Sequence, residues 1–156
     1  MKKFEFLSHT ADIKIRVYGK NLKEIIDNSL LALKNFWGPK LKKTKIEKKI
    51  KITSNNEVNL LIDFLSEVLA QTYIKKTIFV KFEPRIKPNQ KQINTSNNIR
   101  VDLRKNLRRS MYYSLFGKIV GYKFISLSKD IKAITFHQAI LNKINGKYIF
   151  EFIIDI

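Results

Sequence analysis

The stretch IKAITFHQAILNKINGKYIFEFIIDI, residues 131–156, decides the fold because it predicts a β-hairpin. Asn145 and Gly146 form the predicted turn, since a two-residue type I′ turn needs positive φ at both positions and these residue types tolerate it best. The turn sets the register and pairs Ile144 with Lys147. The apolar end of the sequence is therefore expected to be anchored rather than frayed.

The second strand of this hairpin alternates between two faces. Its predicted core face carries Tyr148, Phe150, Phe152, Ile154 and Ile156, and its other face carries Lys147, Ile149, Glu151, Ile153 and Asp155. The pairs expected from an unbulged ladder are Phe136 with Asp155, His137 with Ile154, and Thr135 with Ile156. Asp155 is therefore expected to point away from the core, beside the free main-chain carboxylate of Ile156.

Length and composition predict one domain over residues 1–156, since 156 residues at 44% hydrophobic content suffice for one core and are too few for two independent domains. The absence of cysteine excludes disulfides, thiolate zinc sites and thiol catalysis. No apolar run approaches the length of a membrane span, and polar residues interrupt any signal-peptide core near the start. We expect a cytoplasmic protein that does not use a membrane.

The charge is strongly positive, at +18 from 31 Lys+Arg against 13 Asp+Glu. Such a field attracts nucleic acid, anionic membranes and acidic proteins. The chain is also rich in Lys, Ile and Asn together, a composition that an AT-biased genome produces without selection for binding. Charge alone leaves RNA contact open.

The rest of the chain predicts an α+β fold, with two helices packed on a largely antiparallel β-sheet whose strand order the sequence does not give. Helices are expected over residues 22–36, behind a cap at Asn21, and over residues 57–72. Strands are expected near residues 3–6, 13–17, 41–52 and 77–83. A polar stretch at about 85–99 predicts a flexible loop, and Gly117 and Gly121 predict a turn or bulge.

Basic residues mix with aromatics from Arg100 to Gly117. The RNA-contact candidates are Arg104, Lys105, Arg108 and Arg109, since basic residues beside Tyr112 and Tyr113 can pair with phosphates and stack bases. The same segment is also consistent with a strand whose aromatics are core and whose arginines are solvated. The lysines between Lys42 and Lys49 are typical of a solvated sheet edge.

Four motifs occur in a fixed order: His9-Thr10-Ala11-Asp12-Ile13, the apolar helix over residues 60–69, the strand over residues 131–137, and Asp155-Ile156. Together they resemble the archease family over nearly the whole chain, except for about residues 85–108, where this sequence is longer than is usual. The resemblance implies an accessory protein, not an enzyme, that activates an RtcB-type RNA ligase. It would promote guanylylation and multiple turnover of the ligase in tRNA splicing or RNA repair.

The resemblance also implies a metal site made of Asp12, Asp155 and the main-chain oxygen of Ile156. Such oxygen donors suit Ca²⁺, with Mg²⁺ or Mn²⁺ as alternatives, and not a soft metal. His9 is expected to orient Asp12, and Thr10 and His137 are further candidates for orienting the ligands or contacting the ligase. With an unbulged register, His137 is expected to be packed and hydrogen bonded.

The chain departs from the family at three positions. Where relatives have Gly-Glu, then Asp and then His before the final hairpin, this chain has Gly117-Lys118, Gly121 and Ile125. We expect a weaker metal site, in which Lys118 could replace a bound cation's charge. The alternative function is a basic RNA-binding module, or a chaperone of tRNA-modifying enzymes, because the family has also been associated with a tRNA methyltransferase. No nucleophile, phosphate loop or triad spacing points to an enzyme.

Overall fold

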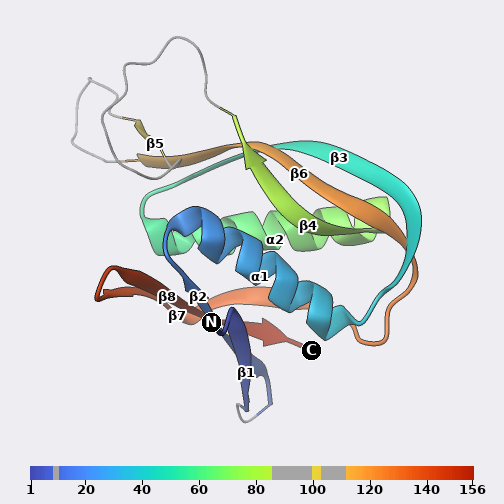
Figure 1. The fold of residues 1–156 in the computed structure, drawn as a ribbon, viewed down its shortest axis with the longest axis horizontal. Coiled ribbons are helices and arrows are strands. Elements are labelled where there is room, and N and C mark those ends of the chain that lie inside the picture. The colour runs from blue at the N-terminus through green and yellow to red at the C-terminus, as the bar shows by residue number, and fades with distance from the viewer. Residues whose placement is uncertain (9–10, 86–99, 103–111) are drawn as a thin grey trace.

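The helices of this chain lie between two β-sheets, so that the fold has three layers (Figure 1). The structure is a computed structural model that describes residues 1–8, 11–85, 100–102 and 112–156. The first sheet contains, in spatial order, β1 (Phe4–Ser8), β2 (Ile13–Gly19), β8 (Lys147–Asp155) and β7 (Ala133–Ile144). The second contains β3 (Lys40–Ser54), β6 (Tyr112–Ser126) and β4 (Thr77–Pro84), and β5 (Arg100–Asp102) also pairs with β6.

Local signals begin and end the helices. The Asn21 side chain accepts a hydrogen bond from the backbone N–H of Glu24 at 2.9 Å and so caps α1 (Leu22–Trp37), which ends at Gly38 with φ 54°. Asn56 caps α2 (Glu57–Lys75) in the same way. Both predicted helices are confirmed, and α2 continues three residues further than expected. Neither helix has the length and apolarity that a membrane span requires, among the residues that the structure describes.

The α+β class is confirmed, but the strands form two sheets instead of one. The reason lies in the helices, which are apolar on more than one side. The buried residues of α1 are Leu22, Ile25, Ile26, Ser29, Leu30, Ala32, Leu33, Phe36 and Trp37. A helix with so broad an apolar surface must be covered from two directions, and α1 contacts both β2 and β4.

The terminal hairpin forms with the predicted turn, since Asn145 and Gly146 have φ values of 51° and 74°. Pairing follows the predicted register from Ile144 with Lys147 as far as Ile140 with Glu151. Phe150, Phe152 and Ile154 are fully buried, which confirms the aromatic core face. Ile156, however, is 44% exposed, so this core face ends at Ile154.

Beyond Ile140 the predicted register is wrong. Ala133 pairs with Asp155 and Thr135 with Ile153, so residues 136–139 of β7 bulge opposite Phe152 alone. Gln138 makes the bulge possible by adopting a left-handed φ of 54°. The expected pairs of Phe136 with Asp155, His137 with Ile154 and Thr135 with Ile156 do not form.

Gly117 and Gly121 lie inside the continuous strand β6, so of the two alternatives expected there, a turn or a bulge, the turn is wrong. Both allow β4 to approach closely. A Cβ atom at Gly121 would lie 2.1 Å from the carbonyl oxygen of Ile78, and one at Gly117 would lie 2.2 Å from that of Glu83. The irregularity beside Gly121 is in β4, where the register shifts between Phe79 and Lys81.

Candidate metal centre

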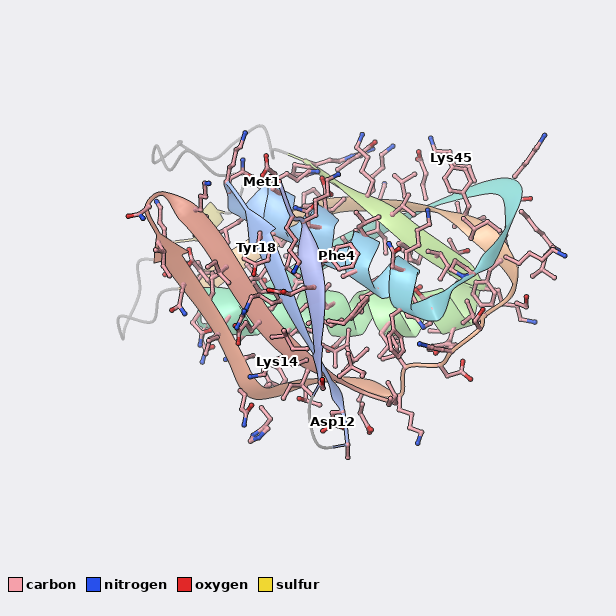
Figure 2. All side chains as sticks on the ribbon, turned by 60° about the horizontal axis from the view of Figure 1, so that its bottom comes forward. Met1, Phe4, Asp12, Lys14, Tyr18 and Lys45 are labelled. Atoms are coloured by element: carbon pink, nitrogen blue, oxygen red, sulfur yellow. The ribbon has the colours of Figure 1, made fainter. Side chains whose placement is uncertain are left out.

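Two aspartates lie at one end of the first sheet. Asp12 is the residue before β2, and Asp155 is the last residue of β8. Because Ile13 pairs with Ile154, the two aspartates occupy the next position on neighbouring antiparallel strands. Figure 2 shows Asp12 at this end of the sheet.

The strand that carries Asp155 is firmly held. Phe150 and Phe152 stack with ring centroids 5.1 Å apart in the core, and β8 pairs with β2 on one side and β7 on the other. The backbone N–H of Lys132 donates to the carbonyl oxygen of Asp155 at 2.8 Å. Ile156 follows directly, which brings its main-chain oxygen to the same end of the sheet.

The neighbouring charges on the outer face of this sheet are paired with one another. Arg16 donates to Glu151 at 2.6 Å and lies 3.3 Å from Glu5, which also accepts from the Tyr18 hydroxyl. Hydrogen bonds from Lys2 and then Tyr18 lower the pKa of Glu5 to about 2. The hydrogen bond to Glu151 is the main cause of a raised pKa for Arg16.

The aspartates differ from these paired groups. Within the described ranges, no hydrogen bond or ion pair engages the side-chain carboxylate of Asp12 or Asp155. Lys14, which stands between Arg16 and Asp12 along β2, lies 3.7 Å from Glu151. Like charges opposite each other on neighbouring strands are unfavourable without a counter-charge. Among the described residues, the two carboxylates at this end of the sheet therefore have no paired counter-charge.

The donor chemistry at this end fits a hard cation. It consists of two partly exposed carboxylates and the main-chain oxygen of Ile156, which are oxygen ligands of the kind that Ca²⁺, Mg²⁺ and Mn²⁺ take. No group of three or more His, Cys, Asp or Glu side chains suited to a metal occurs in the part of the chain that the structure describes. An ion here would thus depend on main-chain oxygens and water as well as on the two aspartates.

His137 does not join the aspartates. It lies in the β7 bulge at the level of Phe152, whereas Asp155 pairs with Ala133. Its side chain is exposed, and among the described residues its ring makes no hydrogen bond, so the packed, hydrogen-bonded histidine expected for an unbulged register does not occur. The bulge displaces His137 from the ladder that the sequence predicted.

Several other candidates lie elsewhere. His9 and Thr10 are outside the described residues, as are the RNA-contact candidates Arg104, Lys105, Arg108 and Arg109 and nearly all of the predicted loop. Lys118 belongs to the second sheet, where Glu47 at 3.0 Å and Glu83 at 3.2 Å hold its ammonium group and raise its pKa. Its charge is thus compensated there. Gly121 also lies in the second sheet, and Ile125 is 57% exposed near the end of β6.

Sequence reasoning did not single out Lys132. The backbone N–H of Lys132 donates to the carbonyl oxygen of Asp155, so this exposed residue lies next to the end of β8. Only the observed register reveals this, because the predicted one pairs Asp155 with Phe136. The bulge in β7 decides which residues border the site.

Comparison with known proteins agrees with this architecture. The sequence profile of the archease protein family matches residues 4–156. The protein archease of Methanosarcina mazei is 29% identical over 99% of this chain and 97% of its own length, and that of Sulfurisphaera tokodaii is 30% identical over the whole of both chains.

Two solved structures share the fold. The solution structure of a Methanobacterium thermoautotrophicum protein superposes with a TM-score of 0.69 at 23% identity, over all of both chains. The crystal structure of a Thermotoga maritima archease, described as a possible chaperone, gives a TM-score of 0.64 at 16% identity over 96% of this chain and 94% of that one. The match to the family profile, over nearly the whole sequence, establishes that this chain belongs to the archease family.

Proposed function

We propose that this chain is a metal-binding accessory protein that activates an RtcB-type RNA ligase. The observation that carries the proposal is the position of Asp12 and Asp155 at adjacent strand ends, without a basic partner among the described residues. A pair of carboxylates that only stabilised the fold would be expected to have counter-charges, as Glu5 and Glu151 do in the same sheet.

The proposed site has groups that hold a metal ion and residues that orient them. Asp12, Asp155 and the main-chain oxygen of Ile156 would hold a divalent cation, with Ca²⁺ as the first choice and Mg²⁺ or Mn²⁺ as alternatives. Bound there, such an ion supplies positive charge for phosphate oxygens. The buried aromatics of β8 fix the direction in which Asp155 faces a partner. The protein acts by placing groups at the ligase's nucleotide site, which lowers a barrier without new covalent chemistry.

The test is RNA sealing by the cognate ligase at substoichiometric enzyme, with and without this protein. Wild type is expected to raise the number of turnovers, whereas Asp12→Ala and Asp155→Ala should not. Asp130→Ala is the matched control, because it removes an exposed carboxylate in the segment before β7. Trp37 is buried in the core, so its fluorescence shows whether each variant is folded.

The outcomes separate the alternatives. Equal stimulation by all four proteins means that the carboxylates are not the active groups. Failure of every protein, wild type included, removes the activator role for this pair. A basic RNA-binding or chaperone-like module is then the remaining candidate. The description of the Thermotoga maritima protein as a possible chaperone favours the chaperone-like alternative.

A further inference from the structure

The outer face of the second sheet carries a row of lysines. Residues of β3 alternate, so that Ile46, Ile50 and Ile52 pack against the core while Lys49 and Lys51 are exposed on the other side. The pairing agrees with this assignment, since Lys49 lies opposite Lys118 and Lys51 opposite Phe116. This face therefore points away from both helices.

A bulge adds two more lysines at one end of the row. Leu41 pairs with Phe124 but Lys45 pairs with Tyr122, so the three residues between them have one residue of β6 opposite. Lys42 and Lys43 are exposed in this bulge. Tyr122, beside them, is 36% exposed. We call these six residues the lysine face: Lys42, Lys43, Lys45, Lys49, Lys51 and Tyr122.

Within the part of the chain that the structure describes, the acids on this sheet leave most of those lysines unpaired. Glu47 lies 3.3 Å from Lys45 and 3.0 Å from Lys118, and Glu83 lies 3.4 Å from Lys81 and 3.2 Å from Lys118. Hydrogen bonds from Lys118 are the main cause of a lowered pKa for both glutamates, which keeps them charged. No acid partner for Lys42, Lys43, Lys49 or Lys51 is present in the described segments.

We propose that the lysine face binds single-stranded RNA. Unpaired lysines on one open sheet attract the phosphates of a nucleic acid backbone. Exposed aromatic rings among them provide surfaces on which unpaired bases stack, which a duplex does not offer. Tyr122 supplies such a ring directly opposite Lys45.

Other anionic partners fit this surface less well. Membrane binding needs apolar side chains that enter the lipid boundary, yet Val120 on this face is only 5% exposed and charged residues surround it. An acidic protein would satisfy the lysines but gives no role to the ring of Tyr122. RNA matches both features of the face, because its phosphates pair with the lysines and its bases can stack on the exposed ring.

The inference goes beyond the proposed activation of a ligase. In Figure 2, Lys45 lies at the upper edge of the molecule and Asp12 at the lower edge, so RNA could lie on the lysine face while the aspartates face another protein. The proposal also differs from the contact predicted at Arg104 to Arg109, because none of those residues belongs to β3.

The experiment is fluorescence anisotropy of a labelled 15-nucleotide RNA without secondary structure, titrated with the full chain in EDTA and without ligase. Wild type is compared with Lys49→Glu/Lys51→Glu. Losing two phosphate contacts should make the slope of log K against log salt concentration less steep by about 1.4. At 0.1 M salt this corresponds to a loss of about 25-fold in affinity for the RNA. The control Lys20→Glu/Lys147→Glu makes the same change in net charge at two exposed lysines of the first-sheet region, and it should retain most of the binding.

A second pair of variants tests stacking. Tyr122→Ala is expected to weaken binding about tenfold, whereas Tyr122→Phe keeps the ring and should bind as wild type does. Equal losses in the two double-lysine variants would mean that only the overall field acts, and would overturn the proposal. So would competition by a duplex as strong as that by the single strand, or lysine-dependent binding to anionic vesicles without binding to RNA. Because neither ligase nor metal is present, these results do not depend on the proposed activator role.

Discussion

Replacing Asp12 by asparagine should stabilise the metal-free protein and abolish its response to a divalent cation. The carboxylates of Asp12 and Asp155 occupy adjacent strand ends without a basic partner among the described residues. Asparagine keeps the size and the hydrogen-bonding oxygen of aspartate but removes its charge. If Asp12 instead stabilised the fold, replacing it by asparagine would lower the stability of the metal-free protein.

The size of the effect follows from the cross-strand position. Like charges opposite each other on neighbouring strands cost about 0.2–1 kcal/mol, and removing one of them recovers that amount. For a chain of this length, about 1 kcal/mol corresponds to roughly 2–4 °C in Tm. A cation at 100 times its Kd stabilises the folded state by about 2.7 kcal/mol, which corresponds to roughly 5–11 °C.

The assay is thermal unfolding followed by Trp37 fluorescence, first in EDTA and then in a Ca²⁺ series. In EDTA, the Tm of wild type should be lower than that of Asp12→Asn. As Ca²⁺ is added, the Tm of wild type should rise above that of Asp12→Asn. Asp155→Asn should behave as Asp12→Asn does. Asp130→Asn is the control, since its only hydrogen bond within the described chain, from Tyr73 at 3.4 Å, reaches an oxygen that asparagine retains. The reasoning is refuted if Asp12→Asn lowers Tm in EDTA, or if Ca²⁺ raises the Tm of both aspartate variants as much as that of wild type.

Three further predictions concern the fold. Gly121→Ala should lower the free energy of unfolding by about 1–3 kcal/mol in a urea titration, because its Cβ would lie 2.1 Å from the carbonyl oxygen of Ile78. An unchanged midpoint would show that β4 can move away. Asn21→Ala should cost about 1 kcal/mol in the same titration by removing the cap of α1, whereas Asn21→Ser should retain most of it; equal losses would exclude capping. In the folded protein the pKa of Glu5 is lowered from 4.5 to about 2, so Glu5 contributes stability that is present above about pH 4.5 and is lost as pH falls toward 2. Glu5→Gln should flatten this part of the acid unfolding curve. An unchanged curve would contradict the contribution of Glu5.

The parts of the fold that the sequence predicted correctly depend on short-range signals. Asn145-Gly146 needs only its own two residues to define a turn, and Asn21 caps a helix through the N–H three residues later. The apolar spacing of the two helices is likewise local. Such features do not change with the rest of the fold, which is why they could be predicted.

The bulge in β7 could not be predicted, because no glycine, proline or asparagine marks it. Gln138 adopts its positive φ in response to pairing on the two sides of residues 136–139. Gly121 was misinterpreted for a related reason. A glycine that admits a neighbouring strand looks the same in sequence as one that turns the chain, and only the approach of Ile78 tells them apart. Both errors concern contacts between distant segments.

The placement of acids bears on the origin of the positive charge. On the outer face of the first sheet, Lys14 and Arg16 both have glutamate partners. On the second sheet, the acids instead gather around Lys118 and leave Lys49 and Lys51 unpaired within the described chain. A lysine-rich genome explains how many lysines a protein has, but it does not explain why Lys14 and Arg16 have acid partners while Lys49 and Lys51 have none among the described residues. That asymmetry is what an RNA-binding face would require, and the matched charge-reversal variants test it directly.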